Sequence, residues 1–141
     1  MKYTGSFRLT PGIGSLDNHL FSMNSIYDPD RTGTGHQPYT HDTWATVYNH
    51  YSVLVFSIKV IGTNTGDVPV ILGILRNDDA TIGDDFDSCI EGGKSVYRVL
   101  ADRSSLGRAN MGYNQYRQFS GAGKQVIQSE FGSNPTEESF F

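Results

Sequence analysis

The chain has little cysteine, little charge and no long apolar run. Its 141 residues include one cysteine, Cys89, which cannot form an internal disulfide, and its apolar neighbour Ile90 favours a small buried side chain over a reactive thiol. No apolar run approaches the ~18 residues that a membrane span needs, and residues 1–3 do not begin a signal peptide. We therefore expect a soluble protein without a disulfide framework.

Basic side chains are also scarce. The sequence carries 11 Lys and Arg against 15 Asp and Glu, which gives a net charge of −4 and an isoelectric point near 5.4. This balance argues against a domain that holds nucleic acid by bulk electrostatics, because such domains show a basic stripe. The densest basic region contains Lys94, Arg98, Arg103 and Arg108, and it predicts at most a modest patch facing nucleic acid.

Catalytic and metal-binding signatures are missing. Gly-x-Ser-x-Gly does not occur, nor do the common glycine-rich phosphate loops. His36 and His41 lie five residues apart, a spacing that zinc sites do not use. Several aspartates within 78–87 could supply oxygen ligands to calcium, but the regular alternation of a calcium loop is absent, so a solvated acidic loop is favoured. We expect no enzyme, no metal and no cofactor.

Glycine and aromatic residues, by contrast, are plentiful. The sequence has 16 Gly, 8 Tyr and 8 Phe, and a hydrophobic fraction of 37%, which favours short strands joined by turns. A chain of this length buries one core, so we predict a single domain, 1–141. In so aromatic a chain, the cluster of Tyr113, Tyr116, Arg117 and Phe119 indicates packing or subunit contact rather than base stacking.

Alternating side chains predict six or seven strands in an antiparallel sandwich. The clearest is Val53 to Ile61, which places Leu54, Phe56, Ile58 and Val60 on one face. The turn residues 64–67 predict that it forms a hairpin with Val68 to Leu75, in which Pro69 marks an edge or a bulge. The other expected strands are Lys2 to Leu9, Leu20 to Tyr27, Lys94 to Ala101, Tyr113 to Phe119 and Lys124 to Ser129, with polar connections at Asn77 to Asp87 and Asp102 to Gly112.

The most informative stretch joins a long loop to a short helix. The loop contains two prolines, which fix their own φ, and two glycines, which allow the backbone more conformations. These residues are Pro29, Pro38, Gly33 and Gly35. After it, the spacing i, i+3, i+4 and i+7 predicts a helix over Asp42 to Tyr51, which Thr40 or Asp42 could cap. Its apolar face would consist of Trp44, Val47, Tyr48 and Tyr51. We expect this face to be packed on a sheet, with Trp44 largely buried.

Several of these motifs together resemble the capsid proteins of small circular single-stranded DNA viruses, the circovirus-like group that encodes a Rep protein. The residues that carry the resemblance are Asp28, Pro29, Asp30, Gly35, His36, Gln37, Pro38, Trp44, Tyr48 and Tyr51, followed by the strand from Ser52, by 90–92 and 97–100, and by 132–135. Such proteins are single jelly rolls, so the resemblance implies an all-β fold with one short helix. It also implies that 35–38 is a structural loop, in which the His36 ring bonds backbone carbonyls.

The resemblance implies a coat protein that self-assembles into an icosahedral shell around a circular single-stranded DNA genome. It also implies that the protein is found in the virion and, during assembly, in the nucleus of the host cell. Two departures matter. The arginine-rich arm usual in such proteins is missing before the first strand, so genome binding is expected to be weak, and the chain stops at residue 141, before the last strands of the jelly roll. A glycan- or ligand-binding β-sandwich module, with Trp44 stacking on sugar, is the alternative.

Overall fold

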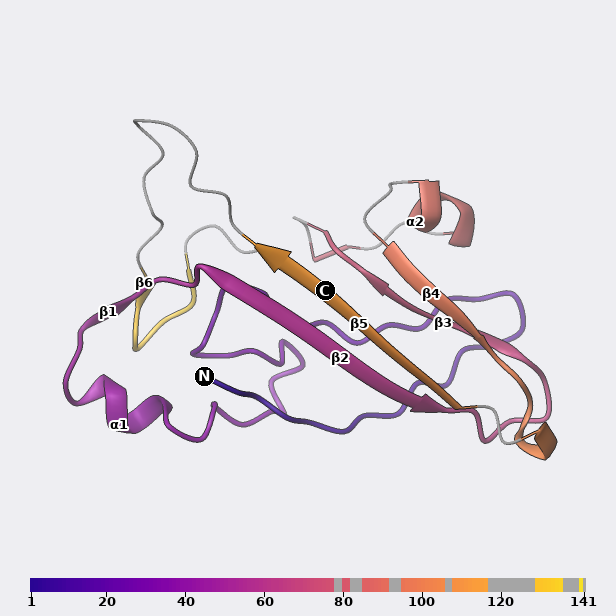
Figure 1. The fold of residues 1–141 in the computed structure, drawn as a ribbon, viewed down its shortest axis with the longest axis horizontal. Coiled ribbons are helices and arrows are strands. Elements are labelled where there is room, and N and C mark those ends of the chain that lie inside the picture. Colours follow the sequence, from indigo (N-terminus) through magenta and orange to yellow (C-terminus); the bar gives the residue numbers. More distant parts are fainter. Residues whose placement is uncertain are drawn as a thin grey trace.

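The computed structural model describes residues 1–77, 80–81, 85–91, 95–105, 108–116, 129–135 and 140. Strands dominate it, and the helices are short (Figure 1). The elements in chain order are α1 (His41–Ala45), β1 (His50–Tyr51), β2 (Val55–Thr63), β3 (Val70–Leu75), α2 (Phe86–Glu91), β4 (Ser95–Leu100), the 3₁₀ turn η1 (Arg103–Ser105), β5 (Arg108–Tyr116) and β6 (Ser129–Glu130).

The strands pair in a nested order. β1 pairs with β6, β2 with β5 and β3 with β4, and all three pairs are antiparallel. The longest ladder runs from Val55 opposite Tyr116 to Thr63 opposite Arg108. In the sequence, each pair therefore lies between the two strands of the pair before it. This is the pairing order of one long β-hairpin whose two arms pair along their length. The prediction of an antiparallel β-rich chain is confirmed.

Phe140 pairs with Ser22 outside the three nested strand pairs, and it also connects this outermost pair to the residue just after β3. Its backbone bridges Ser22 on one side and Asn77, just after β3, on the other. The Asn77 amide donates to the Phe140 carbonyl at 2.9 Å, and the Phe140 amide donates to the Asn77 carbonyl at 2.7 Å. The segments around residues 22, 140 and 77 thus lie side by side next to β3–β4, while the nested pairs β1–β6 and β2–β5 fall between them in the sequence.

Strand β2 begins two residues later than predicted, which leaves Leu54 outside it and exposed, but its own residues alternate as the sequence predicts. Phe56, Ile58 and Val60 are half-buried on its inner face, whereas Ser57 and Lys59 are exposed on the outer one. Alternation follows from the pleat, because successive side chains point to opposite faces of a strand. The fully extended β2 and β5 run together along the length of the molecule (Figure 1).

The predicted hairpin between β2 and β3 is wrong. The Asn64 side-chain amide donates to the carbonyls of Val68 at 2.7 Å and Ala101 at 2.9 Å, and the Arg103 amide donates to the Gly66 carbonyl at 2.9 Å. These bonds attach the turn to the segment that follows β4, so the chain crosses over and β3 pairs with β4 instead. Hairpin pairing was inferred from sequence proximity, and long-range bonds override it.

The two strands predicted before residue 28 are also wrong. Residues 2–9 form no ladder within the described chain, and 20–27 make only short bridges, since the Ser22 amide donates to the Pro29 carbonyl at 2.8 Å and the Arg31 amide to the Leu20 carbonyl at 3.1 Å. Ring contacts hold the first segment instead. Phe7 stacks on His19 with ring centroids 4.1 Å apart and lies 5.7 Å from Phe21.

Other boundaries shift for local reasons. The end of the acidic segment begins α2 at Phe86, and Asp85 caps this helix by accepting the Ser88 amide at 2.7 Å. Strand β5 begins at Arg108, inside the expected connection 102–112, because it pairs with the whole of β2. The expected strand Lys94 to Ala101 is confirmed as β4, which runs over Ser95–Leu100. Of the expected strand 124–129, residues 124–128 lie outside the described residues, and β6 starts at Ser129.

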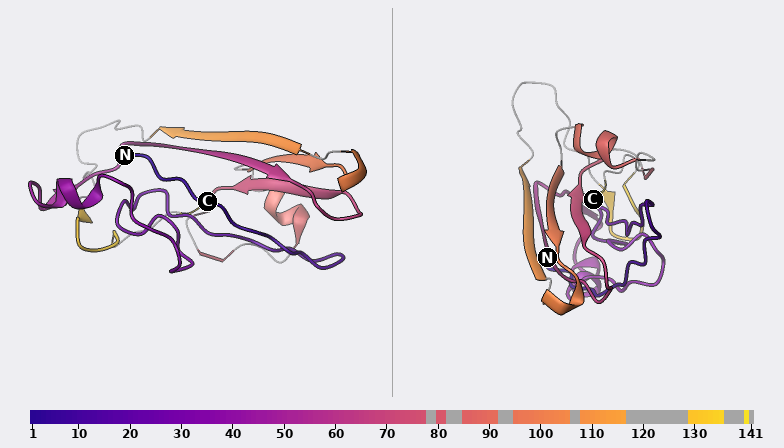
Figure 2. Two further views of the ribbon diagram at one scale, coloured as in Figure 1. Left: turned by 90° about the horizontal axis from the view of Figure 1, so that it is seen from below. Right: turned by 90° about the vertical axis from the view of Figure 1, so that its right-hand side faces the viewer.

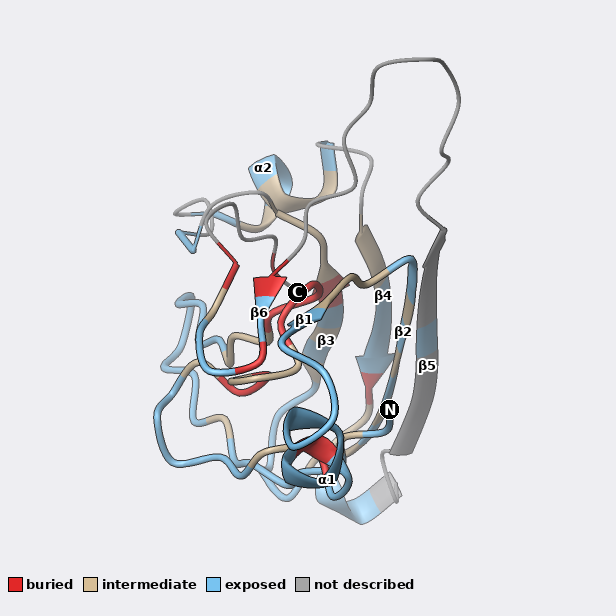
Figure 3. Cartoon of the chain, turned by 90° about the vertical axis from the view of Figure 1, so that its left-hand side faces the viewer, coloured by how far each residue is buried: buried red, intermediate tan, exposed pale blue. Residues whose placement is uncertain are grey.

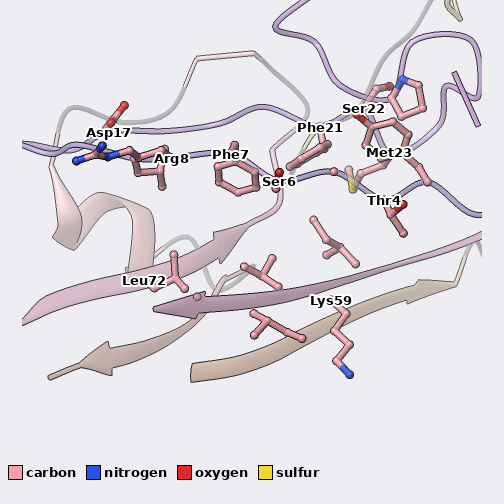
Figure 4. Close-up of a pocket in the computed structure, with 18 of the residues that line it drawn as sticks. Thr4, Ser6, Phe7, Arg8, Asp17, Phe21, Ser22, Met23, Lys59 and Leu72 are labelled. Carbon is pink, nitrogen blue, oxygen red and sulfur yellow. The ribbon is translucent and has the colours of Figure 1, made fainter. Parts of the chain in front are cut away.

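The interior is loosely filled. Buried apolar side chains in the described chain are few: Met23, Ile74, Leu100, Phe131 and Phe140. Many of the buried residues gather near β1, β6 and the chain end (Figure 3). Between the N-terminal segment and strands β2 and β3 lies a cavity of about 2560 Å³ (Figure 4), and the N-terminal segment runs along the side of the molecule away from β5 (Figure 2).

We predict that Phe140→Ala lowers the free energy of unfolding by about 3–5 kcal/mol, because it removes a large buried side chain from the residue that joins two pairs of segments. Urea unfolding followed by circular dichroism measures the change. Ile13→Ala is the control, since Ile13 is fully exposed and should change stability by less than about 0.5 kcal/mol. Equal, small effects of both substitutions would contradict the bridging role.

Candidate functional site

Asp30 is the centre of the loop 28–41. Its Oδ1 accepts hydrogen bonds from the Thr32 hydroxyl at 2.7 Å and the Thr32 amide at 3.1 Å. His19 Nε2 lies 3.0 Å from the same oxygen, at ion-pair distance but poorly aligned for a hydrogen bond. Burial raises the pKa of Asp30, but the bonds from Thr32 and the nearby His19 outweigh it and lower the pKa below its ordinary value. The carboxylate therefore remains charged inside the fold.

Two glycines let the loop close over Asp30. A Cβ on Gly35 would lie 2.5 Å from the Asp30 Cβ and 2.8 Å from the Tyr3 hydroxyl, so no other residue fits without moving them. Gly33 has φ +74, in the left-handed region that glycine adopts without strain. The tight turn thereby brings residue 36 back towards the N-terminal segment.

His36 bonds backbone carbonyls, as predicted. Its Nδ1 lies 2.7 Å from the Gln37 carbonyl oxygen and its Nε2 lies 3.0 Å from the Thr4 carbonyl oxygen. Both nitrogens face acceptors, so both must carry a proton for both bonds to form. The bonds to Gln37 and Thr4 accordingly raise the pKa of His36. With the Tyr3 ring 4.8 Å away, His36 attaches the N-terminal segment to the loop.

The other end of the loop is tied to the far end of the chain. His41 is 3% exposed, and its Nε2 lies 3.0 Å from the Phe131 carbonyl oxygen. The Phe131 ring also contacts Tyr51, with centroids 5.4 Å apart. The Ser25 hydroxyl donates to Asn134 Oδ1 at 2.7 Å. Contacts between residues about a hundred positions apart thus fix the loop in place.

The predicted helix and its buried face are wrong. Helix α1 ends at Ala45, and Thr40 precedes it without a side-chain cap bond. Tyr51 lies on β1 and is half-buried, whereas Trp44, Val47 and Tyr48 are 46%, 66% and 54% exposed. The helical spacing was correct for one turn only. The pairing of β1 with β6 then takes the chain away and leaves this surface uncovered by the described chain.

The structure therefore divides the motif residues into two groups. Asp28, Pro29, Asp30, Gly35, His36, Gln37, Pro38 and Tyr51 belong to the folded loop and its supports, in which Asp28 pairs with Arg31 at 3.4 Å and the Pro38 carbonyl accepts the His41 amide at 2.8 Å. Trp44 and Tyr48 lie outside it, with ring centroids 5.8 Å apart. The sequence reasoning overlooked Tyr3 and His19 and named Asn134 only as part of 132–135, because no local pattern links these residues to residue 30 or residue 25.

The basic residues do not form a patch in the described chain. Arg98 is exposed on β4. The Arg103 side chain pairs with Asp67 at 2.7 Å, which offsets its charge. Arg108 begins β5, but its side chain is not among those that the structure describes. Lys94 and Arg117 lie outside the described residues.

The described residues offer neither a metal cluster nor a helix that could span a membrane. No three His, Cys, Asp or Glu side chains there gather as a metal site would require, while Asp78, Asp79 and Asp84 of the acidic segment fall outside that part of the chain. None of the described helices has the length and apolar character needed to cross a lipid bilayer. A pocket of about 600 Å³ lies beside α1, with Tyr48, Asn49 and Glu130 among its lining.

The chain matches no family model, no curated protein and no solved structure. The family resemblance drawn from its motifs therefore stays a prediction. Function must be inferred from the order of strand pairing and from the surfaces that the chain exposes.

We predict that the attachment of the N-terminal segment by His36 weakens as the pH rises. The folded-state pKa is raised above the ordinary value of 6.5, so the stabilisation is complete below pH 6.5 and is lost as the pH passes the folded pKa. Heteronuclear NOE values of residues 4–9, which report backbone order, should fall between pH 6 and pH 8 in the wild type. His36→Gln should remove this change and His50→Gln, another exposed histidine, should keep it; the same fall in all three proteins would refute the prediction.

Proposed function

We propose that this chain is the coat-protein subunit of a small circular single-stranded DNA virus, folded as a single jelly roll that assembles into a closed shell. One observation carries the proposal: the strand pairs are nested, and Phe140 lies between the outermost segment and the end of β3. A jelly roll is a double-sheet arrangement of antiparallel strands, in which two Greek keys follow from rolling up one long hairpin.

The nested order supports this fold in detail. Going inward along the chain, the pairs are Ser22 with Phe140, β1 with β6, β2 with β5, and β3 with β4. The backbone bonds between Phe140 and Asn77 connect the first pair to the end of β3, the strand of the innermost pair. Nested antiparallel pairing of this kind is what a rolled-up hairpin requires.

A shell subunit needs surface that it does not bury by itself. Within the described residues, the chain leaves many large apolar side chains open to solvent. Large apolar side chains such as Val47, Val68 and Val99 are among those exposed. Symmetric assembly would cover such surfaces by repeating the same contacts between identical subunits. Because one fold hosts many functions, these exposed surfaces add support for a shell to the nested strand order that carries the proposal.

The genome would be held only weakly by these residues. The net charge is −4, and the ion pair between Arg103 and Asp67 removes one cation from the candidate region. Affinity for single strands depends on how many phosphates are neutralised. In this proposal Arg98, Arg103 and Arg108 contribute a modest contact, and the host attachment factor is not specified.

A second function, a glycan- or ligand-binding module, is favoured by one observation. Trp44 and Tyr48 are exposed next to each other, and a pocket of about 600 Å³ beside Tyr48 is lined by polar Gln37, Asp42 and Asn49. That volume lies within the range of roughly 300–1,000 Å³ typical of ligand pockets.

We predict that the purified chain forms particles or symmetric rings, because its exposed apolar surface requires partners. Light scattering coupled to size-exclusion chromatography measures the mass, and negative-stain micrographs show the shape. A lasting monomer at every concentration, with binding on a glycan array, would favour the module and refute the shell.

A further inference from the structure

The first residues of the chain lie along one side of the cavity of about 2560 Å³. Thr4, Ser6 and Phe7 line it on this side, and Leu72 of β3 lines it on the other (Figure 4). Residues 2–9 form no ladder within the described chain, so side-chain contacts attach this segment to the fold. Residues 1–6, hereafter the strap, therefore lie over a space that they do not fill.

The strap is attached differently at its two ends. At its base, the Phe7 ring stacks on His19, with centroids 4.1 Å apart and planes 15° from parallel. Nearer the N-terminus, the Tyr3 hydroxyl donates to Asp30 Oδ2 over 3.4 Å, which is long for a hydrogen bond. The stack at the base is apolar and does not depend on the polar contacts with the loop 28–41. It is the point about which the strap can turn.

His36 provides the shorter polar attachment. Its Nε2 lies 3.0 Å from the Thr4 carbonyl oxygen on the strap, and its Nδ1 lies 2.7 Å from the Gln37 carbonyl oxygen in the loop. A neutral imidazole carries one proton, so either tautomer points a lone pair at one of these oxygens. Two acceptors at such a distance repel each other. The ring therefore cannot keep this position after it loses a proton.

The other ionisable groups here do not change charge between pH 6 and pH 8 in a way that would imitate this effect. Burial and the charge of Asp30 raise the pKa of Tyr3, so its hydroxyl stays protonated. Asp30, whose pKa is below its ordinary value, stays ionised. The bonds to Gln37 and Thr4, and not a neighbouring charge, raise the pKa of His36. The charged and titratable groups around the attachment are Tyr3, Asp28, Arg31, Asp30 and His19.

We propose that the strap covers the cavity while His36 carries both ring protons and swings open about Phe7 when His36 loses one. His36 is exposed, so its ring exchanges protons with the solvent directly. Opening gives solvent access to the inner face of β2, where Ile58 lines the cavity. The switch operates within one chain and does not depend on the assembly of a shell.

Reactivity of a cysteine inside the cavity tests the switch. The parent protein carries Ile58→Cys in a Cys89→Ser background, and its rate of reaction with a maleimide is compared with that of the same protein carrying His36→Ala. The thiolate fraction changes with pH, but it cancels when the two proteins are compared at one pH. His19 is present in both proteins, so any contribution from it cancels as well.

At pH 6 the His36→Ala protein should react about 3-fold faster or more, as expected when an exposed hydrogen-bonded attachment is lost. At pH 8 the two rates should be equal, because the strap of the parent has opened too. His50→Ala, which removes another exposed histidine, should leave the rate unchanged at both pH values. Equal rates of the parent and His36→Ala at pH 6, or a difference that persists at pH 8, would overturn the inference.

A second cysteine position separates opening from general loosening of the fold. Ser57 is exposed on the outer face of β2, next to Ile58 in the sequence. With Ser57→Cys in place of Ile58→Cys, His36→Ala should not change the reaction rate at either pH. An equal acceleration at both positions would mean that His36→Ala loosens the whole sheet, and it would likewise refute the strap.

Discussion

The backbone pairing of Phe140 with residues on both sides is the constraint on which the fold depends. Its amide and carbonyl exchange bonds with Asn77, and it also bridges Ser22. These contacts bring a segment near the start of the chain and one near its end against β3. The pairs β1–β6, β2–β5 and β3–β4 all lie between residues 22 and 140 in the sequence, so this contact closes the nested set.

The loop 28–41 depends on the same closure. Asp30 and His41 are buried polar residues, and buried polar groups are costly unless hydrogen bonds satisfy them. His41 finds its partner at Phe131, immediately after β6, which is present only because β1 and β6 pair. The bonds made by Asp30 and His36 then hold the N-terminal segment over the interior. The exposed surface beside α1 is the outer side of this arrangement, which explains why Trp44 has nothing to pack against within the described chain.

Local patterns in the sequence predicted what local physics controls. The alternation at 53–61 located β2 to within two residues at each end, together with most of its inner face, and the carbonyl bonds of His36 were expected from its loop. Pairing partners could not be read in the same way, since the bonds of Asn64 that separate β2 from β3 involve Ala101, thirty-seven residues away. Trp44 shows the same limit: helical spacing indicates which side chains share a face, but burial depends on what lies opposite. The side chains around Asp30 come from three separate segments, and no motif joins them.

Disulfide trapping tests the nested pairing most directly. In a Cys89→Ser background, Lys59→Cys with Gly112→Cys joins residues that are opposite each other in β2 and β5, where a Cβ on residue 112 meets only the Ile58 carbonyl at 3.5 Å. Lys59→Cys with Leu72→Cys would instead join the strands of a β2–β3 hairpin. Paired antiparallel residues lie within disulfide reach, roughly 4.5–5.5 Å between Cα atoms. Rapid oxidation of the first pair and none of the second is the expected result, and the reverse would contradict the nested fold.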